Sequence, residues 1–352
     1  MILSELHVHN LRNLQPLRVN LHPHLTLVTG LNGSGKTSFL EALYLLGNGH
    51  SFRAREISSL VTYQQSALSV FTKTADEQTV SISKSLSAPT VVKINGTPCL
   101  ASSQLAYLLP TQIFYQDIFQ IIDSGPAVRR TVLDWGLFHV EHTYHGLWKN
   151  YRRALKQRNS LLKQQASVQQ FAPWDKLLSD LANDLHDLRT RYVLKLNERF
   201  KSILAAFSDL SCQLNYYKGW DRKQEDIPLS SILEATLAAD RQRQFTHYGP
   251  HHADMMLTID EHKARFHLSR GQQKMVLFAL KLAQAELVSR HCIHLIDDIN
   301  AELDPTHLSR LIEYIKTNGS QFIITSNTSG WFTDFFQEHH YQLITLQQGQ
   351  QI

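Results

Sequence analysis

The sequence predicts an α/β fold in which a mixed β-sheet of the phosphate-binding-loop (P-loop) type is split by an inserted, compact α-helical lobe. The first observation is a glycine-rich loop, Gly30–Thr37, between a run that indicates a buried strand, Leu25–Thr29, and a helical pattern, Lys36–Leu46. The second is an apolar run, Ile293–Ile296, that ends in two carboxylates. Residues 129–207, between these motifs, have a helical pattern. The chain is therefore expected to return to the sheet only after it has built a separate lobe.

The loop has the spacing G-x-x-x-x-G-K-[ST]. Glycines let backbone N–H groups wrap around phosphates, and the N-terminus of the following helix adds partial positive charge there. Lys36 would reach the β- and γ-phosphates of ATP, and Thr37 would hold Mg²⁺. The candidate nucleotide-binding residues of this segment are Gly30, Asn32, Gly33, Ser34, Gly35, Lys36, Thr37 and Ser38.

Two adjacent carboxylates, Asp297 and Asp298, follow the second apolar run directly. Ligands of α/β sheets bind at the carboxyl ends of the strands, so both side chains are expected near the phosphate loop. Asp297 is the expected Mg²⁺ ligand. Asp298 is placed to orient or deprotonate the attacking water, which makes Asp298 and Lys36 the candidate catalytic residues.

A third motif, Leu268–Lys274, reads Leu-Ser-Arg-Gly-Gln-Gln-Lys and precedes a helical pattern over Met275–Val288. Ser269 is expected to be the N-cap of that helix. A helix N-terminus that carries Ser and Gly is also an anion site, and the two roles are compatible. Ser269, Gly271 and Gln272 are therefore candidates to meet the γ-phosphate of ATP held by a second copy in a head-to-head dimer.

Changes of pattern divide the chain into three parts. Residues 1–123 alternate short strand patterns with turns, residues 124–244 form the helical insertion, and residues 245–352 return to strands and carry the signature and carboxylate motifs. The apolar stripe at 178–192 covers only two heptads, which favours a compact lobe over a long coiled-coil arm.

Composition narrows the class of protein. No apolar run approaches the length that spans a membrane, and the first residues lack the pattern of a secretory signal, so we expect a cytoplasmic protein. Cys99, Cys212 and Cys292 are far apart, which predicts reduced thiols and neither a disulfide framework nor a zinc site. The net charge of +4 is compatible with nucleic-acid binding.

Basic residues gather where no acid interrupts them, at Lys149, Arg152, Arg153, Lys156, Arg158 and Lys163. On a helix, all but Arg158 would share roughly one face. Such a face can bind DNA phosphates without sequence specificity, or it can be an ordinary solvated helix surface. The DNA-binding candidates are Lys149, Arg152, Arg153 and Lys156. Trp148 could stack on bases, although core packing is the favoured interpretation.

With these motifs in place, the chain resembles the RecF family of bacterial recombination mediators, in the SMC/ABC-type class of ATPases, over essentially its whole length. The segments that carry the resemblance are His7–Leu14, Gly30–Thr37, Ser51–Arg53, Gly125–Arg130, Leu133–Gly136, Leu155–Asn159, Tyr248–His251, Leu268–Lys274 and Leu295–Asp304. The phosphate loop alone is generic. The Leu-Ser-Arg-Gly-Gln form, the Asp-Asp pair and the Gly-Pro-x-x-Arg-Arg segment together are specific.

The resemblance implies an ABC/SMC-type ATPase head that uses ATP and Mg²⁺, forms an ATP-dependent homodimer, and has Arg12 and Asn13 near the nucleotide. It also implies DNA binding and slow hydrolysis. The implied partners are mediator proteins of the RecR and RecO type, which help to place recombinase on gapped DNA and contribute to the SOS response. Gln116-Asp117 stands where the family usually has Pro-Glu, although Gln116 could still serve as a metal contact, and His252 stands where the family has Arg or Lys.

Two other functions explain part of the sequence. An ABC transporter ATPase subunit would carry Ser-Gly-Gly-Gln, whereas Arg270 fills the second position here. It would also carry a His after the next strand, where Thr325 and Asn327 stand. A small-molecule P-loop kinase would explain Gly30–Thr37 but not the signature motif. Without that His, we expect turnover well below about 10 s⁻¹, the usual enzyme median.

Overall fold

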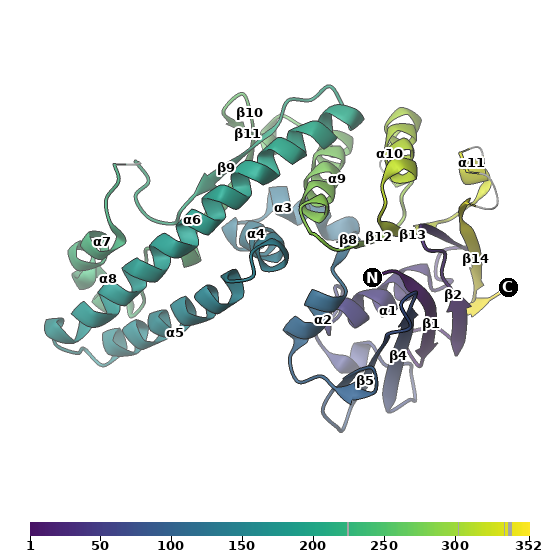
Figure 1. The fold of residues 1–352 in the computed structure, drawn as a ribbon, viewed down its shortest axis with the longest axis horizontal. Helices are drawn as coiled ribbons and strands as arrows, with labels where there is room; N and C mark the ends of the chain where they lie inside the picture. The colour runs from purple at the N-terminus through teal and green to yellow at the C-terminus, as the bar shows by residue number, and fades with distance from the viewer. Residues whose placement is uncertain (224, 302, 334, 337–339) are drawn as a thin grey trace. The chain divides into compact units, whose positions relative to one another are not determined.

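The computed structural model describes residues 1–223, 225–301, 303–333, 335–336 and 340–352. The chain forms two compact units, one from residues 1–118 and 288–352 and the other from residues 119–287 (Figure 1). The chain thus leaves the first unit and later returns to it, as the predicted insertion requires.

The described part of the first unit contains two six-stranded sheets. The first sheet is antiparallel, in the order β2-β1-β4-β5-β6-β7. Its strands are β1 (Leu3–His9), β2 (Leu17–Asn20), β4 (Ala67–Thr74), β5 (Thr79–Ser85), β6 (Val91–Ile94) and β7 (Thr97–Pro98). The second sheet has the order β15-β14-β3-β13-β12-β8 and is parallel except for β15. Its strands are β3 (Leu25–Thr29), β8 (Thr111–Phe114), β12 (Ile293–Ile296), β13 (Gln321–Ser326), β14 (Gln342–Gln347) and β15 (Gln350–Gln351).

The parallel strands form the buried centre of this unit. β3, β8, β12 and β13 are buried along their whole length, as is typical of central parallel strands, and the predicted strands Leu25–Thr29 and Ile293–Ile296 are confirmed. β13 lies between β3 and β12 and is parallel to both, so the phosphate loop and the carboxylates leave the sheet at the same edge. Helix α1 (Lys36–Asn48) contacts strands of both sheets.

The remaining helices of this unit are shorter or lie at its edge. They are η1 (Ile57–Ser59), α2 (Ser102–Leu108), η2 (Gln116–Phe119, whose last residue is assigned to the second unit), α10 (Pro305–Thr317) and α11 (Gly330–Thr333). Among the described residues of the whole chain, no helix has both the length and the hydrophobicity needed to cross a membrane.

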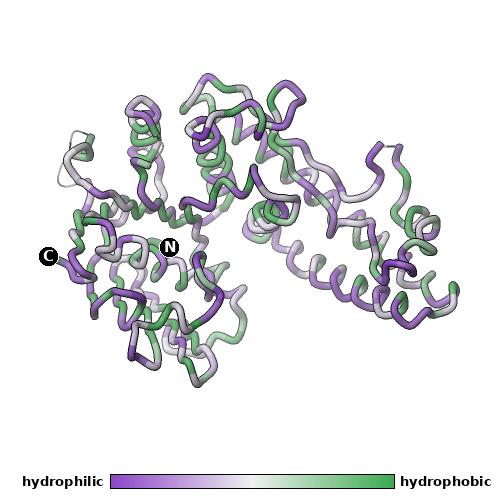
Figure 2. Tube along the Cα trace, turned by 180° about the vertical axis from the view of Figure 1, so that it is seen from behind, coloured by the Kyte–Doolittle hydropathy of each residue, from purple (hydrophilic) through white to green (hydrophobic). Residues whose placement is uncertain are grey.

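Helices dominate the second unit, as the pattern of residues 129–207 predicts. They are α3 (Gln120–Asp123), α4 (Pro126–Val140), α5 (Tyr144–Lys163), α6 (Val168–Phe207), α7 (Leu229–Ala235), α8 (Leu237–Arg243), η3 (Pro250–His252), η4 (Ala264–Phe266) and α9 (Arg270–Glu286). α5 and α6 pack side by side (Figure 1), and hydrophobic and hydrophilic residues alternate along the helices (Figure 2). α6 is 40 residues long in total and extends beyond the apolar stripe at 178–192 on both sides.

A small antiparallel sheet completes the second unit, in the order β11-β10-β9. Its strands are β9 (Gln213–Tyr217), β10 (Asp254–Ile259) and β11 (His262–Lys263). Because β10 pairs with β9 and α9 packs on α6, residues 254–287 are compact with the helical insertion. The sequence predicts a different division, in which residues 245–287 belong to the C-terminal part of the ATPase head.

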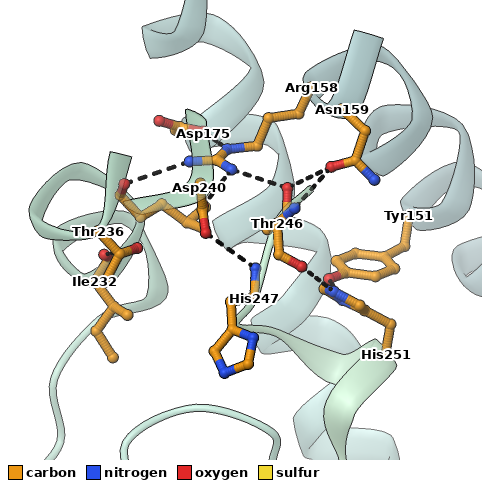
Figure 3. A network of polar contacts seen from close by, with 11 residues as sticks. Tyr151, Arg158, Asn159, Asp175, Ile232, Thr236, Asp240, Thr246, His247 and His251 are labelled. Carbon is orange, nitrogen blue, oxygen red and sulfur yellow. Dashed lines mark hydrogen bonds and ion pairs between the residues drawn. The ribbon is translucent and has the colours of Figure 1, made fainter. Parts of the chain in front are cut away.

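A buried polar network joins the helices of the second unit (Figure 3). The Arg158 side chain is fully buried and donates to Asp175 Oδ1 at 2.6 Å, Asp240 Oδ2 at 2.7 Å and Thr246 Oγ1 at 2.8 Å. Asn159 accepts two hydrogen bonds from Thr246, at 2.9 and 2.7 Å. Arg158 therefore holds α5 against α6 and α8, and it is not part of an exposed basic face.

Candidate nucleotide-binding site

The phosphate loop connects the end of β3 to the start of α1, in the context that its motif requires. Gly35 has φ 110°, and a Cβ atom there would lie 2.7 Å from Leu14 Cδ2, so only glycine fits. Lys36 Nζ donates to the carbonyl oxygens of Gly30 at 2.6 Å and Leu31 at 3.0 Å. Burial lowers the pKa of Lys36, and the charges of Asp298 and Asp297 oppose that shift.

Two threonine hydroxyl groups bind the carboxylates, and one of them belongs to the helix that follows the loop. Thr37 Oγ1 donates to both carboxylate oxygens of Asp297, at 3.1 and 3.0 Å. Thr325, near the end of β13, donates from Oγ1 to Asp297 Oδ1 at 2.8 Å and accepts from the backbone N–H of Asp298 at 2.8 Å. Lys36, Thr37, Asp297 and Asp298 therefore lie together.

The environment of Asp297 raises the pKa of its carboxyl group. Burial raises the pKa of Asp297, hydrogen bonds from Thr325 and Thr37 lower it, the charge of Asp298 raises it, and the charge of Arg53 lowers it. Asp298 has φ 46°, in the left-handed region, where Thr325 holds its N–H. The sequence had suggested Thr325 only as an occupant of the missing His position, and its role in holding both carboxylates needed the register of β13 beside β12.

A turn after β1 supports the outer side of the loop. Asn13 Nδ2 donates to the carbonyl of Gly33 at 2.8 Å, and Ser38 Oγ donates to Asn13 Oδ1 at 3.0 Å. Arg12 binds instead to Glu41 on α1, with Nε and Nη2 donating at 2.9 and 3.0 Å. Asn13 therefore contacts the loop itself, whereas Arg12 reaches the side of the helix behind it.

The hairpin between β14 and β15 also reaches the loop. Gly349 donates its N–H to Ser34 O at 2.9 Å and accepts at its carbonyl from the N–H of Gln15 at 3.0 Å. The φ of Gly349 is 82°, and a Cβ atom there would lie 2.0 Å from Asn13 O. The sequence motifs do not include Gly349, because a glycine near the chain end gives no signal of contact with residues more than 300 positions away.

The other predicted loop residues differ in exposure. Ser34 is buried, whereas Asn32 and Gly33 are exposed. Gln116 follows β8, which pairs with β12, and its side chain is exposed at the same sheet edge as the carboxylates. Glu302, in the family-like segment after the carboxylates, lies outside the described residues.

The signature motif begins α9 in the second unit. Ser269 is the N-cap, as predicted: its Oγ accepts from Gln272 N at 3.3 Å, and Gln272 Oε1 accepts from Ser269 N at 2.9 Å. Ser269 is exposed, and Gly271 and Gln272 are half-buried. Arg270 bonds Asp123 Oδ2 at 2.7 Å, so its charge is partly neutralised.

The predicted basic face lies along α5. The side chains of Lys149, Arg152, Arg153 and Lys156 are exposed and line a hollow of about 760 Å³. Trp148 stacks on Tyr151 at 5.6 Å between ring centroids, and the Arg189 guanidinium lies 4.9 Å from the Trp148 ring centroid, which agrees with core packing.

Comparison with known proteins places this site in a family. The RecF/RecN/SMC N terminal domain family matches residues 2–351. A DNA replication and repair protein RecF of Stutzerimonas stutzeri is 37% identical over 335 residues, covering 92% of this chain and 90% of the relative. One of Pseudomonas syringae pv. tomato is 36% identical over 351 residues, covering 95% of this chain and 94% of the relative.

Solved structures agree with the sequence relatives. A structure of the recombination mediator protein RecF with ATP, in the RecFOR pathway, matches with a TM-score of 0.85 and 25% identity, covering 99% of this chain and 96% of the other. An Smc head bound to the C-terminal winged-helix domain of ScpA matches with a TM-score of 0.63 and 16% identity, covering 100% and 96%, and this likeness shows the fold alone. The predicted ABC/SMC-type head with an inserted helical lobe is therefore confirmed, and the chain belongs to the RecF family of the RecF/RecN/SMC proteins.

Proposed function

We propose that the protein is an ATP-dependent DNA-binding protein of replication and recombinational repair, and that ATP closes two copies head to head while hydrolysis releases them. The observation that carries the proposal is the contact of Thr37, in the phosphate loop, with Asp297, in a chain of the RecF family. The names of the relatives support the repair role, and the RecF–ATP structure supports the nucleotide.

The proposed nucleotide chemistry uses residues of the first unit. Lys36 would move from the loop carbonyls to the β- and γ-phosphates. Thr37 and Asp297 would hold Mg²⁺, with Gln116 as a further contact, and the ion would neutralise phosphate charge when bound. Asp298 would orient the attacking water from its fixed backbone position. Asn327, and not a His, directly follows β13, which supports slow turnover and a switching role.

The second half of the site would come from another copy. Ser269, Gly271 and Gln272 lie at the N-terminus of α9, with Ser269 exposed, and a helix N-terminus suits the γ-phosphate of a nucleotide held by the partner. The exposed basic face of α5 would bind DNA phosphates. We further propose that the protein works in the cytoplasm with mediator proteins of the RecR and RecO type at single-strand gaps. There it would help to load recombinase, and it would contribute to SOS induction.

Mixing two inactive variants tests the shared site. Lys36→Ala removes the phosphate contact in one copy, and Ser269→Ala removes the signature contact in the other. A mixed dimer keeps one intact site, so the mixture should recover ATP hydrolysis and, in light scattering, ATP-dependent dimers. A mixture that stays inactive, or a mass that is indifferent to ATP, would contradict the head-to-head proposal.

A further inference from the structure

A fully buried carboxylate lies behind the phosphate loop. Glu41 is one helical turn after Thr37 on α1, on the same face, and its side chain has no exposed surface. Burying a charge in this way is unfavourable unless it is paired and hydrogen-bonded. Neither the phosphate-loop motif nor the proposed chemistry uses this residue, so its partners indicate what it does.

Its first partner is Arg12, in the turn that supports the loop. The two parallel hydrogen bonds from Arg12, at 2.9 and 3.0 Å, are a bidentate pair with defined geometry. Arg12 has φ 54°, in the left-handed region, and the next residue, Asn13, bonds the loop carbonyl of Gly33. Glu41 therefore fixes both the guanidinium of Arg12 and the turn that carries Asn13.

Its second partner is Ser51, which also binds the backbone of the residues that follow it. Ser51 Oγ donates to Glu41 Oε1 and accepts from the backbone N–H groups of Arg53 at 2.9 Å and Ala54 at 3.0 Å. Arg53 Nη1 also lies 3.8 Å from Glu41 Oε2. Glu41 thus holds Arg53 twice, through its backbone and through its side chain.

The two arginines differ in freedom. The side chain of Arg12 is 21% exposed, whereas that of Arg53 is 42% exposed, and the charge of Arg53 acts on Asp297. Glu41 is one carboxylate between two guanidinium groups, so the three side chains together carry a net charge of +1. That charge can attract an anionic ligand only where the guanidinium groups are held in place.

We propose that Glu41 is a positioning residue of the nucleotide site, which sets Arg12 directly and Arg53 through the Ser51 relay for the binding of Mg-ATP. The inference rests on the proposed function, since the ligand that it serves is the nucleotide. Glu41 would thus set the positions of two arginine side chains without contacting the nucleotide phosphates itself.

The test compares Glu41→Gln with Asp240→Asn. Asp240 is a buried carboxylate bound by Arg158 in the other unit (Figure 3), so its loss removes a similar buried charge away from the loop. Both variants should lower the melting temperature. Only Glu41→Gln should weaken the binding of a fluorescent ATP analogue with Mg²⁺, measured well below the melting temperature, by about tenfold, the worth of one charge-assisted hydrogen bond.

A second pair of variants separates positioning from simple destabilisation. Ser51→Ala breaks the relay but leaves the Arg12–Glu41 pair, so it should weaken ATP binding only about threefold, while Ser51→Thr keeps the hydroxyl and should restore it. If Glu41→Gln does not fold, this pair carries the test. The combined Glu41→Gln and Arg53→Ala variant should lose less affinity than the sum of the single losses.

The outcomes are distinct. ATP binding of wild-type strength in both Glu41→Gln and Ser51→Ala, or strictly additive losses in the combined variant, overturns the positioning role. Lys36→Ala reports on the proposed function separately, because retained ATP binding in that variant would reject the nucleotide site as a whole. Loss in Lys36→Ala with no loss in Glu41→Gln rejects only the inference.

Discussion

At the level of single residues, hydroxyl groups organise the candidate nucleotide site. Thr37 and Thr325 both bond Asp297, and Thr325 also holds the backbone of Asp298. These short side chains fix the position of two adjacent acids, although the charge of Asp298 still raises the pKa of Asp297. Their cost of ordering is small, because a threonine side chain has few rotamers.

Thr325→Val tests this arrangement, because it keeps the shape of the side chain and removes its hydroxyl. We expect unfolding free energy to fall by about 1–3 kcal/mol, since the Asp298 N–H loses its partner. Mg²⁺-dependent ATP hydrolysis should fall as well. Thr325→Ser keeps the hydroxyl and should retain most of both, as measured by denaturant unfolding and phosphate release. Equal activity in the valine and serine variants would show that the hydroxyl is not needed.

His251 gives the second unit a defined pH dependence. Burial lowers its pKa from 6.5 to about 4, and its hydrogen bond to Thr246 O opposes that shift. Because that carbonyl can only accept, Nε2 carries the proton and Nδ1 accepts from the Tyr151 hydroxyl at 2.7 Å. The neutral ring is therefore the form that the fold binds.

The contribution of the His251 imidazole to the free energy of unfolding should be fully present above about pH 6.5 and should be lost as the pH falls toward 4. The reason is that, as the pH falls, the imidazole of the unfolded chain is protonated before that of the folded chain. The loss should not exceed roughly 3 kcal/mol. His251→Gln keeps a donor and an acceptor without titrating, so its unfolding free energy should depend less on pH than that of the wild type. Parallel pH profiles for the two proteins would contradict this account.

At the level of elements, turns far from the motif support the phosphate loop. The β14–β15 hairpin contributes one glycine, Gly349, to both the loop and the Asn13 turn. The β6–β7 hairpin carries Gly96, which has a similar φ of 76° but nothing near its missing side chain. The two glycines share a left-handed backbone conformation and differ in their surroundings.

Gly96→Ala should cost about 1 kcal/mol, the penalty for a left-handed alanine. Gly349→Ala should cost about 1–3 kcal/mol more, because its Cβ meets Asn13 O at 2.0 Å, and it should weaken ATP binding as the turn is pushed away. Thermal unfolding and nucleotide titration measure the two effects. Similar losses in both variants would mean that the hairpin does not support the loop.

Helix α9 offers a way to separate a structural cap from a phosphate contact. Asp is as good an N-cap as Ser, so Ser269→Asp should keep the melting temperature near that of the wild type. Its negative charge would repel a γ-phosphate, so ATP-dependent dimers should be lost in light scattering. Retained dimers would assign Ser269 to the helix cap alone. Ser269→Ala removes the cap and should cost about 1 kcal/mol.

At the level of the whole molecule, the sequence motifs are divided between two compact units. The phosphate loop and the carboxylates belong to the unit of residues 1–118 and 288–352, and the signature helix and the basic face belong to residues 119–287. The proposed switch would bind nucleotide in the first unit and DNA on the second, so it needs both.

Charge reversal tests the DNA-binding face. Lys149→Glu, Arg152→Glu and Lys156→Glu together should weaken DNA binding and reduce the salt slope by about 2–3, given about 0.9 for each phosphate contact on duplex DNA. The matched control reverses Arg191, Lys195 and Lys201, three exposed basic residues of α6. Fluorescence anisotropy over a salt series measures both. Equal weakening by the control would indicate only a general charge effect.

The sequence by itself determined the secondary elements of the site, because local signals carry them. The apolar runs of β3 and β12, the glycine spacing of the loop and the Ser-x-x-Gln cap of α9 are all short-range patterns. Only the tertiary structure showed that Thr325 bonds Asp297, that Gly349 bonds the loop, that Glu41 bonds Arg12, that Arg158 is buried, and that residues 254–287 pack with the insertion. These facts depend on strand register and on partners distant in the chain, and the pattern of one segment contains no information about which remote segment will cover it.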